Sequence, residues 1–178
     1  NLGKKGEYYE DQKNFGEAIK YYEQMMSIFP SSYYPYFKLG RVKREINDFK
    51  GAIEDYTKSI KFASFYKTYV NRAIVFIKID EEEKALNDLD EALKLEPDDV
   101  LALFHRGKIH LKKGNYRESL IDFDKVINIS LDKAAPYRLR GFAKYKLEDK
   151  KGAFEDWTKA AEIGDKLASQ ALKTYLNN

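Results

Sequence analysis

One short theme recurs five times along this chain of 178 residues, at a nearly constant spacing. A small residue marks the second half of each copy, at Ala18, Ala52, Ala85, Ser119 and Ala153, so successive copies are 34, 33, 34 and 34 residues apart. A period in this range is typical of solenoids, in which each short unit packs only against its neighbours. The sequence therefore predicts a repeat protein.

Within each copy, two stretches carry apolar residues at the spacing of an α-helix, for instance Ala52, Tyr56 and Ile60. Turn-forming residues separate the two stretches at Asn47-Asp48, Asp80, Gly114-Asn115 and Glu148-Asp149. Small residues, such as Gly40 before a turn and Ala52 after it, indicate where the two helices meet closely. We therefore predict an all-α fold of antiparallel helix pairs.

In these residues the copies resemble tetratricopeptide repeats. The family's pattern begins with an aromatic residue or Leu, here Leu2, Tyr36, Tyr69, Leu103 and Tyr137. A small residue follows at Gly6, Gly40, Ala73, Gly107 and Gly141, and a large one in the second helix at Tyr22, Tyr56, Leu89, Phe123 and Trp157. The closing Pro of the pattern is present only at Pro30 and Pro97, and the inner aromatic residue is replaced by Lys43, His110 and Lys144.

The resemblance implies a right-handed superhelical solenoid that forms a single array. Its repeats are expected at about 1–32, 33–65, 66–99, 100–133 and 134–165, with a capping helix over 165–178. The polar residues of that helix are expected to face water: Lys166, Ser169, Gln170, Lys173 and Asn177. Since Asn1 falls inside a first helix and no initiating Met precedes it, we expect the chain to be part of a longer protein or a processed product.

Charge is divided unevenly between the two kinds of helix, although the net charge is only +3. The first helices of repeats two to five, over 33–46, 66–79, 100–113 and 134–147, hold fifteen basic residues and one acidic residue, Glu45. The first repeat instead carries Glu7, Glu10 and Asp11. In the family that these repeats resemble, first helices line the concave groove. We therefore expect a basic groove with an acidic mouth, which would attract anionic partners and speed their association.

Some of these basic residues are expected to have a structural role. In each of three repeats, an arginine before the turn and an aspartate after it are equally far from that turn. The pairs are Arg72 and Asp88, Arg106 and Asp122, and Arg140 and Asp156. Residues equidistant from the turn of a hairpin lie at one height, so each Arg is expected to pair with its Asp. The second repeat, with Leu39 opposite Asp55, is expected to lack such a pair. Where a pair is partly buried, loss of one partner would cost about 3–5 kcal/mol.

The remaining basic residues, with neighbouring aromatic and polar ones, form the candidate groove. Because residues three or four apart share a helix face, the candidates are Phe37, Arg41, Arg44, Lys67, Asn71, Lys78, Phe104, His105, Lys108, Lys112, Arg138, Phe142 and Tyr145. We predict that they bind an acidic segment, extended or helical, of a protein partner. The family's clamp for chaperone tails matches only at Asn71 when placed on repeats two to four, and only at Lys67 when placed one repeat earlier, so we do not expect that clamp.

Neither an enzymatic function nor a cofactor or metal is expected. His105 and His110 are five residues apart, so they do not share a helix face as a metal-binding pair four apart would. The sequence has no glycine-rich phosphate loop and no Cys, and no apolar run reaches the ~18 residues of a membrane span. These features leave the compartment and the oligomeric state open, and they favour the cytoplasm only slightly.

Two other functions stay open at this level. Basic residues interleaved with Tyr and Phe are also what a protein needs to bind single-stranded RNA or DNA. The sequence pI of 8.7 lies below the value above about 9 that is typical of nucleic-acid-binding domains. Alternatively, the array could self-associate or pack against another part of a longer chain. Of the three functions, we favour the binding of a protein segment.

Overall fold

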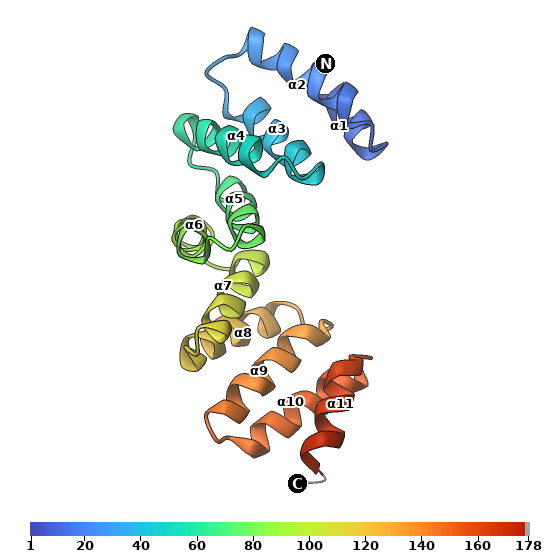
Figure 1. Ribbon diagram of the computed structural model, residues 1–178, viewed down its shortest axis with the longest axis vertical. Helices are drawn as coiled ribbons and strands as arrows, with labels where there is room; N and C mark the ends of the chain where they lie inside the picture. The colour runs from blue at the N-terminus through green and yellow to red at the C-terminus, as the bar shows by residue number, and fades with distance from the viewer. Residues whose placement is uncertain (177–178) are drawn as a thin grey trace. The chain divides into compact units, whose positions relative to one another are not determined.

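The computed structural model describes residues 1–176, and helices are the only regular secondary structure in that range (Figure 1). The helices are α1 (Leu2–Asp11), α2 (Phe15–Ile28), α3 (Tyr33–Glu45), α4 (Phe49–Phe62), α5 (Tyr66–Lys78), α6 (Glu82–Leu95), α7 (Val100–Lys112), α8 (Tyr116–Ile129), α9 (Ala134–Lys146), α10 (Lys150–Glu162) and α11 (Lys166–Leu176). They form two compact parts, called here the N-terminal half (Asn1–Leu95) and the C-terminal half (Glu96–Asn178). The predicted all-α fold is confirmed.

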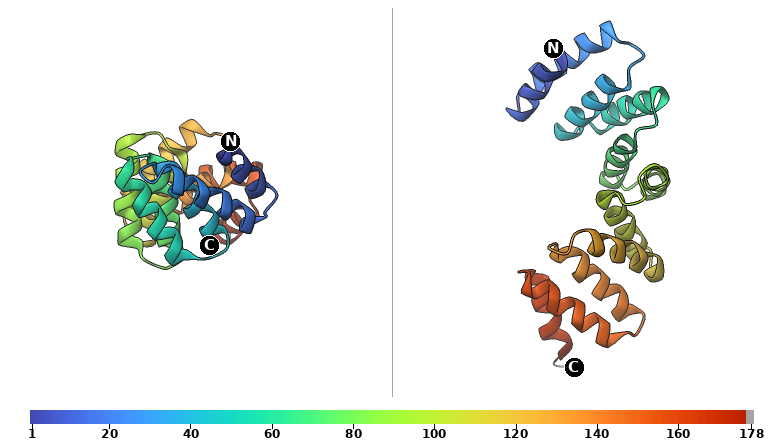
Figure 2. Two further views of the ribbon diagram at one scale, coloured as in Figure 1. Left: turned by 90° about the horizontal axis from the view of Figure 1, so that it is seen from above. Right: turned by 180° about the vertical axis from the view of Figure 1, so that it is seen from behind.

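Consecutive helices pack as antiparallel pairs within each half, and Figure 2 shows the pairs from two further sides. The N-terminal half contains the pairs α1–α2, α3–α4 and α5–α6. The C-terminal half contains α7–α8 and α9–α10, and α11 packs against α10. The pairs span residues 2–28, 33–62, 66–95, 100–129 and 134–162, and α11 begins at Lys166.

A residue in the left-handed backbone region forms each hairpin turn. Its φ is 56° at Lys13, 62° at Asn47, 59° at Asp80, 80° at Gly114 and 66° at Glu148. Only the glycine adopts this conformation without a steric cost to a Cβ atom. Four of these five residues stand at the turns predicted from the sequence. In most of the pairs the residue that follows caps the second helix with its side chain.

Glycine in a first helix makes room for a ring of the second helix. A Cβ atom on Gly6 would lie 2.5 Å from Cε1 of Tyr22, and one on Gly40 would lie 2.6 Å from Cε1 of Tyr56. Both distances are far below van der Waals contact, so no larger residue fits without moving the ring. The close approach was expected between Gly40 and Ala52, but the nearest atoms belong to the ring of Tyr56.

The C-terminal half closes with α11, which covers the core around Trp157. Ala168 is fully buried in that core. The predicted exposure of three polar residues on α11 is confirmed, namely Lys166, Gln170 and Lys173. Ser169 is instead half-buried, and its hydroxyl donates to the backbone oxygen of Asp165 at 3.2 Å. Asn177, also predicted to face water, lies outside the described residues. Within residues 1–176, none of the helices has the length and apolarity that crossing a membrane requires.

Candidate functional site

The three predicted Arg–Asp pairs are formed between the first and second helices of their repeats. Nε and Nη2 of Arg72 donate to the two carboxylate oxygens of Asp88 at 2.8 and 2.7 Å. The same two-pronged geometry is found in Arg106–Asp122 and Arg140–Asp156. The aspartates are at most 5% exposed, and burial raises the pKa of Asp88 in spite of the opposing effect of Arg72. These arginines therefore stabilise the helix pairs and are poorly placed to bind a ligand.

Two lysines form similar pairs at positions where the family pattern has an inner aromatic residue. Nζ of Lys43 lies 2.6 Å from Oδ2 of Asp55, and Nζ of Lys144 lies 2.9 Å from Oδ2 of Asp156. The partner of Asp55 in the second repeat is thus a lysine, and not an arginine at the height of Leu39. The prediction compared residues at the same height in the hairpin, which places Leu39 opposite Asp55. Lys43 lies one turn further along α3, and its side chain is long enough to reach that carboxylate.

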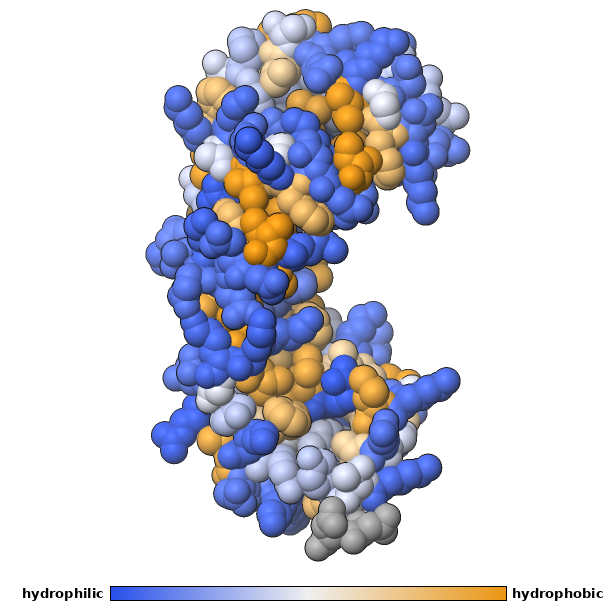
Figure 3. All heavy atoms as spheres, in the orientation of Figure 1, coloured by the Kyte–Doolittle hydropathy of each residue, from blue (hydrophilic) through white to orange (hydrophobic). Residues whose placement is uncertain are grey.

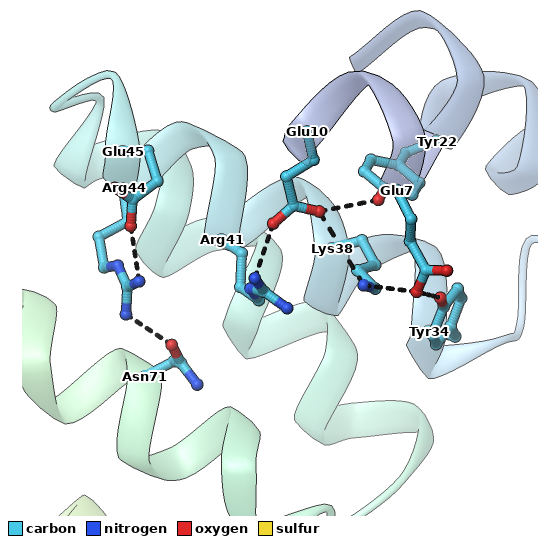
Figure 4. A network of polar contacts seen from close by, with 9 residues as sticks. All are labelled: Glu7, Glu10, Tyr22, Tyr34, Lys38, Arg41, Arg44, Glu45 and Asn71. Atoms are coloured by element: carbon cyan, nitrogen blue, oxygen red, sulfur yellow. Dashed lines mark hydrogen bonds and ion pairs between the residues drawn. The ribbon is translucent and has the colours of Figure 1, made fainter. Parts of the chain in front are cut away.

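In the N-terminal half, carboxylates of α1 neutralise two of the cations of α3 (Figure 4). Nζ of Lys38 lies 2.8 Å from Oε1 of Glu7, and Nη2 of Arg41 lies 2.8 Å from Oε1 of Glu10. The Lys38 side chain is almost completely buried, which is tolerated because its charge is paired. The predicted groove residue Arg41 is thus already bound to a carboxylate of the same chain.

Two tyrosine hydroxyls complete this network. Tyr34 donates to Glu7 at 2.6 Å, and Tyr22 donates to Glu10 at 2.9 Å. Hydrogen bonds from Lys38 and Tyr34 lower the pKa of Glu7, so its carboxylate is charged at neutral pH. Burial and the hydrogen bond to Glu10 raise the pKa of Tyr22, which remains a donor. With two cations and two carboxylates, the network is neutral.

Arg44, the last cation of α3, has different partners. Nη1 of Arg44 donates to Oδ1 of Asn71 on α5 at 2.6 Å, and Nη2 donates to Glu45 at 2.7 Å. Nδ2 of Asn71 donates to the backbone oxygen of Lys67 at 2.7 Å. The fold therefore brings the predicted residues Arg44 and Asn71 together, while Lys67 and Lys78 extend into solvent from α5.

Several predicted groove residues belong to the packing between helices. Phe37 is only 6% exposed and is part of a buried cluster with Tyr56, so its prediction as a contact residue is wrong. Tyr145 lies between Trp157 and Tyr175, with ring centroids 5.6 and 4.4 Å away, because α11 covers it. In both places an aromatic residue on a first helix faces a neighbouring helix.

The first helices of the C-terminal half contain no carboxylate. Together, α7, α9 and α11 hold nine Lys and Arg residues and no Asp or Glu. Nε of Arg138 lies 2.9 Å from Oδ2 of Asp165, which precedes α11. The predicted residues Lys108 and Lys112 are exposed, as is Lys146. Lys108 and Lys146 each lie over a phenylalanine ring of their own helix, at 5.7 and 5.4 Å.

A largely apolar cavity lies beside these cations. Its volume is about 470 Å³, and it is lined by Leu111, Arg138, Leu139, Phe142, Trp157, Leu167, Gln170, Ala171, Thr174 and Tyr175. Phe142 and Leu167 remain 39% and 60% exposed, and Figure 3 shows apolar surface beside hydrophilic side chains on this half. Only Arg138 and Phe142 of the lining were predicted site residues. The others could not be recognised without knowing how α11 packs on α9 and α10.

The histidines are half-buried side chains of α7. Burial, and then the nearby charge of Lys108, lower the pKa of the predicted groove residue His105. Its ring lies 5.9 Å from that of Phe104, another half-buried candidate. Among the described residues, no group of three or more His, Asp or Glu side chains is arranged to hold a metal ion.

Comparison with known sequences identifies the repeats. A family model described as tetratricopeptide repeat matches residues 1–32, 33–65 and 100–133, and one described as TPR repeat matches residues 75–114. TPR repeat-containing protein MJ1428 of Methanocaldococcus jannaschii is 30% identical over 165 residues, which cover 86% of this chain and 29% of that protein. Human Sperm-associated antigen 1 is 36% identical over 85 residues, 46% of this chain and 9% of that protein. The chain thus spans less than a third of the length of these relatives.

Solved structures share the fold. A crystal structure of MamA protein has a TM-score of 0.81 at 22% identity and covers 94% of this chain and 92% of its own. The crystal structure of YrrB, described as a TPR protein with an unusual peptide-binding site, has a TM-score of 0.82 at 20% identity, with 97% and 90% covered. At these identities the likeness concerns the fold alone.

Proposed function

Because this chain belongs to the tetratricopeptide repeat family, whose members are generally non-enzymatic scaffolds for protein–protein interaction, we propose that it binds a segment of a protein partner. The segment carries acidic residues and a large apolar side chain. It binds to the C-terminal half, on the surface formed by α7, α9 and α11. The peptide-binding site named for YrrB, a protein of the same fold, is consistent with this kind of partner.

The combination of an apolar cavity with unopposed positive charge supports the proposal most strongly. Four cations on these helices pair with aspartates on other segments, namely Arg106, Arg138, Arg140 and Lys144. Lys108, Lys146 and Lys166 are exposed. The cavity of about 470 Å³ falls in the range of about 300–1,000 Å³ that ligand pockets occupy.

The apolar cavity and the exposed lysines would contribute to binding in different ways. Burying a Leu or Phe side chain in the cavity would contribute about 1.5–3 kcal/mol, which is the main source of affinity. The exposed lysines would attract acidic residues of the segment, raise the association rate and fix its orientation. In the N-terminal half, Glu7 and Glu10 already neutralise Lys38 and Arg41, so the same partner would find less unopposed charge there.

The binding of single-stranded RNA or DNA is less well supported. Bases stack on accessible aromatic rings, whereas Phe37 and Tyr145 are packed between helices. Self-association is a further alternative, because the same cavity could receive a side chain from a second copy. The experiment below distinguishes both alternatives from the binding of a protein segment.

The test uses a labelled synthetic peptide that alternates Glu with Leu and Phe, and its affinity is measured by fluorescence anisotropy. Two double variants address the two features: Lys108→Glu with Lys146→Glu, and Phe142→Ser with Leu167→Ser. The matched control is Lys150→Glu with Lys151→Glu, which makes the same charge change at exposed positions of α10. Circular dichroism checks that each variant retains its helices.

We expect the wild type and the control to bind the peptide with equal affinity. The lysine double variant and the Phe142→Ser, Leu167→Ser double variant should each bind it at least about tenfold more weakly. Equal binding by all four proteins would contradict the site. Binding of a labelled oligouridine in preference to the peptide would favour the nucleic-acid function. A concentration-dependent dimer in sedimentation that Phe142→Ser with Leu167→Ser abolishes would favour self-association.

A further inference from the structure

Tyr22 is a buried tyrosine at this repeat position whose hydroxyl has an acceptor. Its ring crosses the first helix of its pair at Gly6. Its hydroxyl then meets the residue four positions after that glycine, Glu10, and donates to Oε2 at 2.9 Å. The same carboxylate also forms an ion pair with Arg41, whose Nη2 lies 2.8 Å from Oε1. A buried phenol and an arginine therefore share one carboxylate.

Tyr56, 34 residues later, repeats the geometry of Tyr22 without the carboxylate. Its ring crosses α3 at Gly40, and the residue four positions after that glycine is Arg44. A guanidinium group can only donate hydrogen bonds, so it cannot replace a carboxylate as acceptor. Tyr56 is 0% exposed, and its hydroxyl has no hydrogen-bond partner among the described residues. Burial raises its pKa, so it is a proton donor at neutral pH. An unsatisfied buried hydroxyl is rare and calls for an explanation.

The surroundings of this hydroxyl are rich in donors. Arg44 donates to Asn71 and to Glu45, and the positive charges of Arg44 and Arg41 oppose the rise that burial causes in the pKa of Tyr56. Glu45 is an exposed neighbour in the sequence, and a surface pair of this kind contributes little. An acceptor from outside the chain would therefore displace it easily.

We propose that Arg44, Asn71 and the hydroxyl of Tyr56 form a binding site for a carboxylate group of an acidic protein partner. In this site the ligand carboxylate takes the place that Glu10 occupies in the first repeat. It accepts hydrogen bonds from Tyr56 and Arg44, and Asn71 fixes the orientation of the guanidinium group. The carboxylate reaches the buried hydroxyl after a rotation of the Arg44 side chain, whose partners are themselves side chains. The site lies in the N-terminal half and does not depend on the cavity of the C-terminal half.

The probe for this site is labelled hexaglutamate, which has no apolar side chain to occupy that cavity, and hexaglutamine is its uncharged control. All measurements use the full chain carrying Lys108→Glu with Lys146→Glu, so that the C-terminal half contributes little charge. The test variant is Tyr56→Phe, and the matched control is Tyr22→Phe, which removes a hydroxyl that already has an acceptor.

In that background, Tyr56→Phe is expected to weaken hexaglutamate binding about tenfold, as the loss of a hydrogen bond to a charged group does, and to leave the melting temperature unchanged or raised. Tyr22→Phe is expected to lower the melting temperature and leave the affinity unchanged. Arg44→Gln should abolish binding while helicity is retained. Equal affinity of Tyr56→Phe and its parent would overturn the proposal, as would binding of hexaglutamine or failure of hexaglutamate to bind. These outcomes leave the cavity proposal intact, because that proposal is tested with a different peptide.

Discussion

The two halves hold equal numbers of cations, counted on the first helices of their repeats and on α11, but they differ in the carboxylates on the same helices. In the N-terminal half, α1, α3 and α5 hold nine Lys and Arg residues together with four carboxylates. In the C-terminal half, α7, α9 and α11 also hold nine, with no carboxylate. Two of the N-terminal carboxylates, Glu7 and Glu10, bind cations of α3 directly. The number of cations therefore says less about a binding surface than the positions of the carboxylates do.

The second difference concerns apolar surface. In the N-terminal half the aromatic residue Phe37 is part of the core, and the face of α3 toward α1 is a polar network. In the C-terminal half the packing of α11 leaves a cavity with Phe142 and Leu167 partly exposed. A partner that needs both a charge and an apolar anchor is thus expected to prefer the C-terminal half.

The largest expected effect concerns the structural pairs. Asp156 forms ion pairs with both Arg140 and Lys144, whereas the ion pair of Asp55 in the described part of the chain is with Lys43. We expect Asp156→Ala to lower the free energy of unfolding by about 3–5 kcal/mol, because it leaves partly buried cations unpaired. Asp55→Ala should cost less, because a single lysine can extend its amino group into water. Urea denaturation of both variants measures the difference, and equal losses would show that the two pairs are energetically alike.

A smaller effect is expected from removing the carboxylates that distinguish the halves. Glu7→Gln with Glu10→Gln would free Lys38 and Arg41 and make the N-terminal half resemble the C-terminal half. We expect about tenfold tighter binding of hexaglutamate, since two unopposed cations are added, and a loss of about 1–3 kcal/mol of stability. Anisotropy and urea denaturation test the two parts.

The control for that prediction is Glu17→Gln with Glu23→Gln on α2, which makes the same charge change away from α3. It should leave the affinity for hexaglutamate nearly unchanged. If both double variants tighten binding equally, the gain comes from net charge and not from the release of Lys38 and Arg41.

The smallest effect is a dependence on pH. The pKa of Glu7 is lower in the fold than its ordinary value near 4.5. Its carboxylate therefore contributes stability above that ordinary value, and the contribution is lost as the pH falls through the lower folded value. Glu7→Gln should lower the melting temperature more at pH 6 than at pH 3, as followed by circular dichroism. An equal decrease at both pH values would show that the charge of Glu7 does not matter.

Much of the fold could be predicted because the repeats are in phase and each position has one physical role. The turn residues Asn47 and Asp80 adopt the left-handed conformation expected of a tight turn. The pairing of Arg72 with Asp88 followed from their equal distance to that turn. Such predictions succeed because they depend on contacts within one helix pair.

The candidate site was harder to predict because it depends on contacts between pairs. Phe37 shares a helix face with Arg41 in the sequence pattern, but a neighbouring helix covers it. Tyr145 and Leu167 take their environments from α11, whose packing no repeat pattern describes. The sequence pattern marks Lys43 only as a replacement of an aromatic residue, because its contact with Asp55 depends on the length of the lysine side chain.

The difference between the halves is tested most directly by a titration of the labelled-nitrogen protein with the peptide that alternates Glu with Leu and Phe, followed in amide proton–nitrogen correlation spectra. Our account predicts that the largest shifts fall on α9 and α11, around Phe142, Leu167 and Ala171. Smaller shifts are expected around Arg44 in α3. Largest shifts on α1 and α3, with those of α9 and α11 unchanged, would contradict it.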